Sequence, residues 1–364
     1  MRTIVVSAVN IRKGGTLKIL NNCLLYLSSL TDKYRIIALV HDKELAFYEG
    51  IEYIEVPWSM KNWVLRLWCE YVTMHNISRK IQPVYLWLSL HDTTPNVKAE
   101  HRAVYCQTSF PFLRWNFRDL FFNYKIALFE IFTRYAYRIN IKRNDFIVVQ
   151  QEWLKHGFSK MFHVSEDKFI VAPPERKNIN INSNIELTKC RSFLYVSTPD
   201  CHKNFELLCQ ATEMLEKEIG TGKFKVYITI SGNENRYARW LYKKWGKVDS
   251  LKFTGFLNKE QLHKYYESAD CLVFPSRIET WGLPISEFAT YGKPMLLADL
   301  PYAHETSIGS TQSAFFDPYN PDDLKNKMEL LIKDDTSFLS VIPILKTDSS
   351  FVYTWKDLFD ILLQ

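Results

Sequence analysis

At 364 residues, with 47% hydrophobic and 24% charged residues, the chain is too long for one ordinary core and has the composition of a folded protein, not a disordered one. Its net charge of +6 is compatible with anionic ligands or anionic lipid surfaces. Sustained basic runs, zinc fingers and RNA-recognition signatures are absent from the sequence, which argues against nucleic acid as a partner.

The apolar runs and the cysteines indicate in which cellular compartment the protein is expected. No run approaches the roughly 18 to 20 apolar residues that cross a bilayer, and the first, Ile4–Val9, is too short for a signal peptide and is typical of a buried strand. The seven cysteines are scattered and never spaced as CxxC, so neither a disulfide framework nor a zinc site is indicated. We expect a cytoplasmic protein with reduced, buried cysteines.

Short β-rich runs alternate with longer amphipathic ones in the first half of the chain. Buried strands are predicted at Thr3–Val9, Arg35–Val40, Glu52–Val56, Val84–Leu90, Ala103–Cys106 and Phe146–Gln150. Between the first two, Thr16–Leu30 has leucines at helical spacing. Such alternation predicts βαβ units and a mainly parallel sheet, so residues 1–173 are interpreted as an N-terminal Rossmann-like domain.

The pattern breaks at residues 174–188, where prolines and a polar, asparagine-rich run are typical of a linker. A second alternating series follows, with strands predicted at Ser192–Ser197, Lys225–Ser231, Leu251–Phe253, Asp270–Phe274 and Met295–Ala298. Residues 189–350 are therefore interpreted as a second Rossmann-like domain. The predicted fold class is α/β, with two doubly wound domains facing across a cleft. Residues 351–364 have a helical period and are a candidate for crossing back to the first domain.

The segment 271–294 is predicted to form one complete strand–loop–helix–strand unit. A buried strand leads into a loop that carries Glu279. A helix is expected to start at Pro284, because proline is favoured at the first helical position. Gly292 supplies a left-handed C-terminal cap, and the next strand begins at Met295.

The place of this unit in the fold indicates its chemistry. The loop follows the carboxyl end of a strand, where open α/β sheets bind ligands, and a helix start offers unpaired N–H groups to a pyrophosphate. Gly282 lets the backbone of the turn with Leu283 and Pro284 approach a ligand closely. Glu287, expected in the first helical turn, is within reach of ribose hydroxyls, and Glu279 can accept hydrogen bonds from the hydroxyls of a sugar ring.

Glu279 and Glu287 form an E-x7-E pattern around the turn of residues 280–284. With the flanking strands and the G-L-P turn, it resembles the family-four retaining glycosyltransferases of GT-B fold. In that family the first glutamate contacts the donor sugar and the second the nucleotide ribose, so the resemblance implies these roles here. The alternative is that Glu287 only complements the helix dipole and Glu279 is a solvated loop residue.

A glycine pair, Gly14 and Gly15, follows the first predicted strand and opens a helix. A glycine-rich turn at such a place lets the backbone approach a phosphate, and the resemblance places it near the donor diphosphate. A plain turn is the alternative.

Lys203 lies just after the first strand of the second domain. The resembling family has a lysine there which, with an arginine several residues earlier, neutralises the diphosphate. Ser197 stands about where the arginine is expected, and His202 and Arg277 are candidates to compensate for it. An ordinary surface lysine is the alternative for Lys203.

Two loops that follow strands of the first domain are predicted to line the cleft from the acceptor side. One carries His91 and Asp92, either of which can orient or deprotonate an acceptor hydroxyl. The other begins at Gln107, where related bacterial enzymes often carry histidine, and this departure weakens the case for acid–base chemistry at residue 107. The alternative is that these residues are loop caps and turn formers.

Residues 113–143 interleave nine aromatic residues with arginines and lysines. A basic, aromatic helix can lie on an anionic membrane and so approach a lipid-linked acceptor. Because the aromatic residues occur on several faces, a helix with one face in the core and the other in solvent is an equal alternative.

The resemblance implies a retaining hexosyltransferase that uses a nucleotide-diphosphate sugar and a glycan or polyprenyl-linked acceptor, in O-antigen or capsule assembly. No D-x-D motif occurs, so neither a metal nor another cofactor is expected, and backbone N–H groups with Lys203 are expected to stabilise the leaving nucleotide. No carboxylate is placed for a double displacement. The implied route is attack from the leaving-group face, with the β-phosphate receiving the acceptor proton.

Other classes of function stay open at this point. A GT-B-type sugar-nucleotide epimerase or phosphorylase is the nearest alternative, followed by a non-catalytic nucleotide-binding protein. A nicotinamide oxidoreductase is disfavoured because neither domain contains the G-x-G-x-x-G fingerprint.

Overall fold

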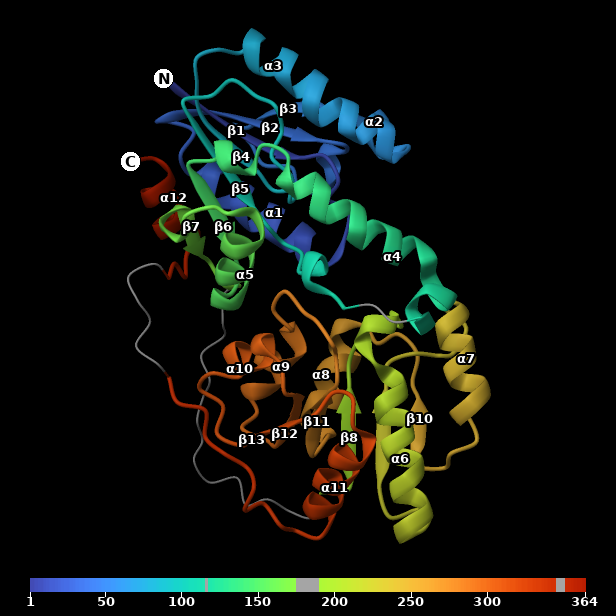
Figure 1. The fold of residues 1–364 in the computed structure, drawn as a ribbon. Helices are drawn as coiled ribbons and strands as arrows, with labels where there is room; N and C mark the ends of the chain where they lie inside the picture. Colours follow the sequence, from blue (N-terminus) through green and yellow to red (C-terminus); the bar gives the residue numbers. More distant parts are fainter. Residues whose placement is uncertain (115–116, 175–189, 345–350) are drawn as a thin grey trace. The chain divides into compact units, whose positions relative to one another are not determined.

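In the computed structural model drawn in Figure 1, the chain folds as two compact units. The structure describes residues 1–114, 117–174, 190–344 and 351–364. Unit 1 comprises Met1–Pro111, Ile131–Glu175 and Thr347–Gln364, and unit 2 comprises Phe112–Glu130 and Arg176–Lys346. Among the described helices, none combines the length and the apolar character needed to cross a bilayer.

Unit 1 is built on a seven-stranded sheet of order β3-β2-β1-β4-β5-β6-β7 in which all neighbours pair in parallel. The order of the first six strands is that of a Rossmann sheet, which confirms the predicted class. The strands are β1 Arg2–Ala8, β2 Tyr34–Val40, β3 Glu52–Glu55, β4 Val84–Ser89, β5 His101–Tyr105, β6 Phe146–Val149 and β7 Phe169–Val171. The sequence did not predict β7.

Side chains that alternate along the strands supply two separate clusters to the two faces of this sheet. Ile4, Val6 and Ala8 of β1 join the cluster that α1 (Gly14–Ser28) covers. Val5, between them, joins the other cluster, which contains Cys69 and residues of α3 (Met74–Lys80). Both faces are therefore buried, as expected for a parallel sheet.

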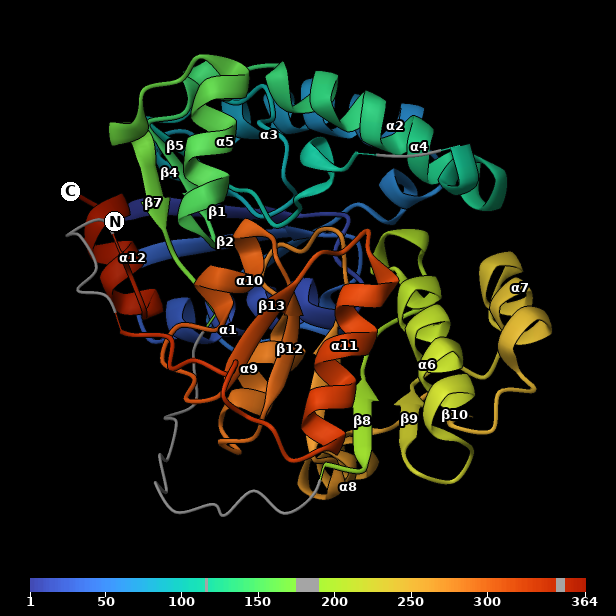
Figure 2. The ribbon, with the colours of Figure 1, turned by 60° about the horizontal axis from the view of Figure 1, so that its bottom comes forward.

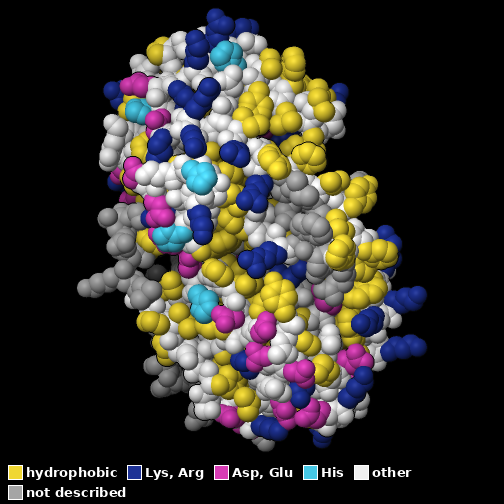
Figure 3. Space-filling model, viewed as in Figure 1, with side chains coloured by type: hydrophobic (Ala, Val, Ile, Leu, Met, Phe, Trp, Pro, Cys, Tyr) yellow, Lys and Arg dark blue, Asp and Glu magenta, His cyan; other side chains and the backbone are white. Residues whose placement is uncertain are grey.

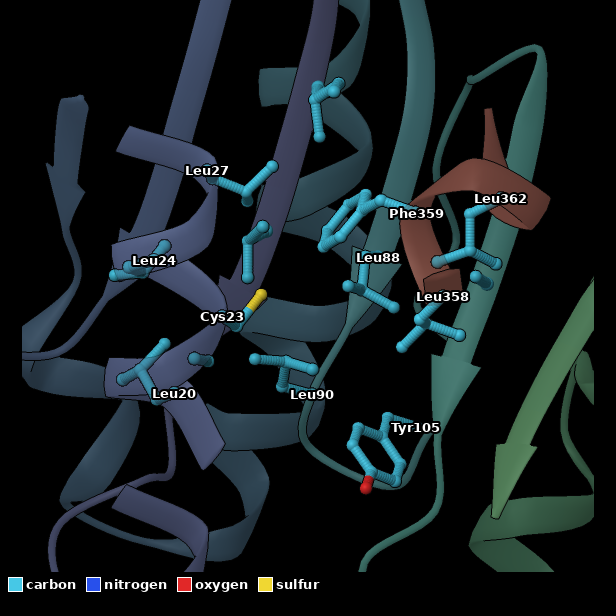
Figure 4. Packing of buried hydrophobic residues seen from close by; sticks show 14 of the residues in the cluster. Leu20, Cys23, Leu24, Leu27, Leu88, Leu90, Tyr105, Leu358, Phe359 and Leu362 are labelled. Carbon is cyan, nitrogen blue, oxygen red and sulfur yellow. The ribbon is translucent and has the colours of Figure 1, made fainter. Parts of the chain in front are cut away.

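The end of the described chain lies in the core of unit 1. Helix α12 (Trp355–Leu362) contributes Leu358, Phe359 and Leu362 to the same cluster as α1. Figure 4 shows the ring of Phe359 reaching from α12 toward Leu27 and Leu88. The ring of Phe359, which is fully buried, stacks on Tyr26 at a centroid distance of 5.5 Å.

Unit 2 contains a six-stranded sheet of order β10-β9-β8-β11-β12-β13, again with parallel neighbours throughout. This is the complete strand order of a Rossmann sheet. The strands are β8 Ser192–Tyr195, β9 Lys225–Ile228, β10 Leu251–Phe253, β11 Cys271–Phe274, β12 Met295–Ala298 and β13 Ser313–Phe316. The sequence did not predict β13.

Helices connect the strands in both units. Figure 2 shows α6 and α11 side by side in unit 2. The helices not yet given are α2 Trp63–Trp68, α4 Phe117–Arg138, α5 Glu152–Phe162, α6 Phe205–Ile219, α7 Arg236–Trp245, α8 Lys259–Ser268, α9 Leu283–Ala289, α10 Pro301–Thr306 and α11 Pro321–Ile332. All seven cysteines are buried and form no disulfide.

One part of the predicted domain division is wrong. The sequence assigned all of residues 1–173 to the first domain, whereas Phe112–Glu130 groups with unit 2. The physical reason is that Asn123 has a non-helical backbone and interrupts α4, and the part before it packs on side chains of unit 2 such as Trp240. Of the predicted linker, residues 174–188, all but Pro174 lies outside the described residues.

Candidate functional site

The loops after two adjacent strands of unit 2 meet at the carboxyl edge of its sheet. Strands β8 and β11 pair directly, with Leu194 opposite Leu272. After β8 the chain forms the short 3₁₀ turn Cys201–Lys203. The amide of Arg277, after β11, donates to the carbonyl of His202 at 2.8 Å. Parallel pairing thus brings together two loops that are more than 70 residues apart in sequence.

These loops join Lys203 to Glu279. The Nζ of Lys203 donates to Oε1 of Glu279 at 2.6 Å, and the side chains are 16% and 12% exposed. The carbonyl of Lys203 also accepts from the hydroxyl of Tyr195 at 2.7 Å. The result is a fixed, nearly desolvated ammonium–carboxylate pair, in which one group attracts phosphate oxygens and the other accepts hydrogen bonds from hydroxyls.

The turn before α9 has the backbone that the sequence pattern requires. Gly282 has a φ of +83°, the left-handed region in which a side chain is strained, and a Cβ there would lie 3.2 Å from Cδ1 of Ile285. The helix begins at Leu283 with Pro284 as its second residue, one position earlier than expected. After α9, Gly292 has a φ of +64°, and β12 begins at Met295, as predicted.

The expected place of Glu287 in the first helical turn is wrong. Because α9 begins at Leu283, Glu287 is its fifth residue, and the first turn contains no acidic residue. Glu287 is exposed, and its Oε2 accepts from the hydroxyl of Tyr266 on α8 at 3.0 Å. Burial raises the pKa of Tyr266, and the contact with Glu287 raises that pKa further. The carboxylate therefore has an oriented but solvent-accessible position.

Arg277 lies in the same loop as Glu279 but is buried. Its Nη2 donates to the carbonyl of Cys201 at 3.1 Å and to Oδ1 of Asp119 at 2.7 Å. His202 is also buried, and burial is the main cause that lowers its pKa well below the usual value. At the position of the expected arginine, the amide of Ser197 donates to the hydroxyl of Thr229 at 3.0 Å.

Gly14 and Gly15 belong to unit 1 and form the first turn of α1. Gly14 has a φ of +71°, and a Cβ there would meet nothing within 4 Å. Both glycines are exposed. The turn therefore leaves open space at the start of a helix, as a backbone that approaches a ligand requires.

His91 and Asp92 also belong to unit 1. His91 is fully buried, with Nε2 3.1 Å from Oγ of Ser7 and Nδ1 3.0 Å from Oγ1 of Thr93. Burial lowers its pKa to about 4. Asp92 has a φ of +70°, and its carboxylate accepts from the amide of Gln107, which ties the two predicted acceptor loops together. Burial raises the pKa of Asp92 to about 6. Both side chains are held by protein partners.

Sequence reasoning missed two buried carboxylates. Glu70 is fully buried in a π-helical turn, where it accepts from Arg66 at 2.9 Å and contacts His91 at 3.4 Å. Asp119 is the partner of Arg277. A lone acidic residue in an apolar helical stretch was the one available signal for each, since such a charge is rarely buried without a partner.

Of the predicted site residues, the structure joins Lys203, Glu279 and Arg277 through two adjoining loops, with Gly282 closing the second loop. Glu287 contacts Tyr266 instead. Within the described residues, no group of three or more His, Cys, Asp and Glu could hold a metal ion.

Known proteins resemble this chain in sequence over part of its length. Residues 177–342 match the model of "Glycosyl transferases group 1". An uncharacterized glycosyltransferase of Methanocaldococcus jannaschii is 24% identical over 225 residues, which are 58% of this chain and 57% of that protein. The O-antigen chain mannosyltransferase RfbU of Salmonella typhimurium is 23% identical over 201 residues, 54% of this chain and 53% of that protein. The matches thus span little more than half the length of these relatives.

Solved structures match nearly the whole chain. The lipopolysaccharide outer core galactosyltransferase WaaB superposes with a TM-score of 0.62 at 14% identity, covering 92% of this chain and 91% of that one. Anabaena HepE in complex with UDP and glucose gives a TM-score of 0.62 at 11% identity, covering 93% and 92%. Such likeness shows the fold. Residues 177–342 therefore match the family model of the glycosyl transferases group 1, and the chain has the GT-B fold.

Proposed function

We propose that the chain is a retaining, metal-independent hexosyltransferase that moves a sugar from a nucleotide-diphosphate sugar to a glycan or polyprenyl-linked acceptor in O-antigen or capsule assembly. The observation that carries the proposal is the Lys203–Glu279 pair, 2.6 Å long, at the carboxyl edge of β8 and β11. It stands beside the left-handed Gly282 turn, inside the family's domain. This pair combines the two chemistries that a sugar diphosphate requires.

The known proteins support the donor and the acceptor class. The HepE structure is a complex with UDP and glucose, which favours a nucleoside diphosphate as the leaving group. Two of the relatives are named as O-antigen chain mannosyltransferases, which favours a surface polysaccharide as the product. We place the reaction on the cytoplasmic side of the membrane.

In the proposed reaction, the bond between the anomeric carbon and the diphosphate oxygen breaks while the acceptor oxygen bonds to the same face of that carbon. The acceptor proton passes to an oxygen of the leaving β-phosphate. Lys203 and backbone N–H groups after Gly282 stabilise the charge that develops on this phosphate, and Arg277 adds a second cation. Glu279 binds the hydroxyls of the donor sugar, and Glu287 binds those of the ribose. Gly14 and Gly15 provide backbone for the diphosphate, and Asp92 and His91 shape the acceptor side.

The decisive experiment tests donor binding first and transfer second. UDP- and GDP-linked hexoses are first screened for thermal stabilisation of the full chain. The donor that stabilises the chain is then incubated with a polyprenyl-linked acceptor. Mass spectrometry identifies the product, and NMR of its anomeric proton gives the anomeric configuration. Glu279→Ala should abolish transfer with the fold intact, while Glu267→Gln, at a 57% exposed carboxylate of α8, should not. Undiminished turnover of Glu279→Ala, or an inverted anomer, contradicts the proposal.

Contact with an anionic membrane is part of the proposal. In residues 113–143, aromatic residues such as Phe117, Phe132 and Tyr135 are 86%, 66% and 63% exposed. Helix α2 adds Trp63 and Trp68, 49% and 58% exposed. Figure 3 shows hydrophobic side chains gathered over α2. Exposed aromatics near arginines and lysines suit the headgroup region of a bilayer.

Vesicle sedimentation tests this contact. The full chain should sediment with vesicles that contain phosphatidylglycerol more than with pure phosphatidylcholine, and less so in high salt. Serine at both Trp63 and Trp68 should reduce the bound fraction. Serine at Phe256, which is 89% exposed in unit 2, is the matched control. Equal binding of all variants would contradict the contact.

A further inference from the structure

A segment that lies outside the family's domain in sequence packs on the donor-binding unit. Phe112–Glu130 comes between β5 and β6 of the first sheet, yet groups with unit 2. The ring of Phe122 lies 5.1 Å from that of Trp240. Arg236 lies over the ring of Phe121 at 4.1 Å and donates to its carbonyl at 3.2 Å. The family's domain therefore receives a structural element from elsewhere in the chain.

This segment delivers one carboxylate to a buried arginine. Oδ1 of Asp119 accepts from Nη2 of Arg277 at 2.7 Å, with the side chains 10% and 3% exposed. Burial alone would lower the pKa of Arg277, but the hydrogen bond and the charge of Asp119 outweigh it and raise that pKa. The pair is thus a desolvated, charge-assisted contact, which differs from the solvent-exposed pairs that contribute little.

Arg277 in turn joins the two loops of the candidate site. Its backbone amide donates to the carbonyl of His202, and its Nη2 to that of Cys201. Lys203 directly follows His202 in the first loop, and Glu279 lies two residues after Arg277 in the second. Lys203 and Glu279 are the two members of the 2.6 Å ion pair. The orientation of the guanidinium therefore sets how the two loops are held against each other.

The guanidinium is not saturated by these contacts. Its Nε is buried and has no hydrogen-bond partner among the described residues. Asp119 binds a single nitrogen, so the arginine keeps donor capacity that a phosphate oxygen is suited to use. Buried donors left without a partner are uncommon, and a bound ion or water is one explanation for them.

We infer that Asp119 is a positioning residue for the donor site: through Arg277 it fixes the loops that carry Lys203 and Glu279 against each other for a diphosphate. This inference rests on the proposed function. It adds a residue outside the family's domain to the machinery of that domain, and it makes donor binding depend on the docking of the first part of α4.

The test compares Asp119→Ala, Asp119→Asn and Asp119→Glu in the full chain. UDP and GDP binding is measured by calorimetry, and kcat and KM for the sugar nucleotide by product formation. Asp119→Ala should weaken nucleotide binding and lower kcat/KM about 10- to 100-fold, as small misplacements of catalytic loops do. Asp119→Glu, which can reach Arg277 again, should restore much of both.

Glu218→Gln is the matched control, because Glu218 forms a 2.6 Å ion pair with Lys325 in the same unit, between α6 and α11. It should leave nucleotide affinity unchanged. If Asp119→Ala lowers the melting temperature but binds nucleotide as tightly as the unmodified chain does, Asp119 only stabilises the fold and the inference fails. If Asp119→Ala does not fold, Asp119→Asn and Asp119→Glu decide. If the unmodified chain binds neither nucleotide, the proposed function itself fails, which is a different outcome.

Discussion

Lys203 and Glu279 are 76 residues apart in the sequence, and the Nζ of one lies 2.6 Å from Oε1 of the other. Each follows a strand of the same parallel sheet, so the contact exists because β8 and β11 are neighbours. The two side chains neutralise each other. In the proposed function, the donor exchanges this ion pair for a phosphate on the ammonium and hydroxyls on the carboxylate.

The first prediction concerns the coupling of this pair. Glu279→Gln and Lys203→Met should each lower kcat/KM about 100-fold or more, since each removes a group that we propose contacts the transition state. The double variant should lose much less than the product of the two, because residues in direct contact are not additive. Initial rates at several donor concentrations measure all three variants. Additive losses would show that the two side chains act independently.

Much of the fold was predictable because local patterns were strong. Strands β10 and β12 begin and end at the predicted residues, and the G-L-P turn with its following helix lies one residue from its expected start. Strands β7 and β13 were not predicted.

The site was predictable only in part, for a physical reason. Sequence motifs placed Lys203 and Glu279 on their loops, but only the sheet order sets their separation. The role of Asp119 was unpredictable, because its partner Arg277 is 158 residues away in the sequence. In addition, the segment that contains Asp119 groups with unit 2, whereas the residues on both sides of that segment belong to unit 1. Contacts of that range leave no local pattern.

The second prediction concerns the turn before α9. Gly282→Ala should destabilise the fold by about 1 to 2 kcal/mol from the left-handed backbone alone, and by more because its Cβ would stand 3.2 Å from Ile285. Gly14→Ala is the control, with a φ of +71° but no atom within 4 Å of a Cβ. Urea unfolding measures both variants. A smaller loss at Gly282 than at Gly14 would refute the steric argument.

The third prediction concerns two adjacent residues whose titrations oppose each other. Folding lowers the pKa of His91 from 6.5 to about 4, so its contribution to stability is present above pH 6.5 and is lost as pH falls through 4. Folding raises the pKa of Asp92 from 3.8 to about 6, so its contribution is present below pH 3.8 and is lost as pH rises through 6. Each amounts to roughly 3 kcal/mol, and the two largely cancel.

Asp92→Asn should therefore unmask the histidine. Relative to the unmodified chain, this variant should lose about 3 kcal/mol of unfolding free energy between pH 7 and pH 4. Urea titrations at pH 4, 5, 6 and 7 measure the difference, and Asp249→Asn, at a 62% exposed carboxylate, controls for the loss of one charge. A difference that does not vary with pH would show that Asp92 is ionised alike in the folded and unfolded chain.

The fourth prediction concerns the helix that ends the chain. Phe359 of α12 is fully buried against Tyr26 of α1, so Phe359→Ala leaves a cavity in the core of unit 1 and should cost about 3 to 5 kcal/mol. Phe256→Ala, at an 89% exposed ring, removes the same atoms and should change stability by no more than about 0.5 kcal/mol. Urea unfolding measures the stability of both variants. Equal stability of the two variants would mean that α12 adds no burial to the folded chain. A large loss confined to Phe359→Ala would show that unit 1 depends on residues that come both before and after residues 177–342 in the sequence.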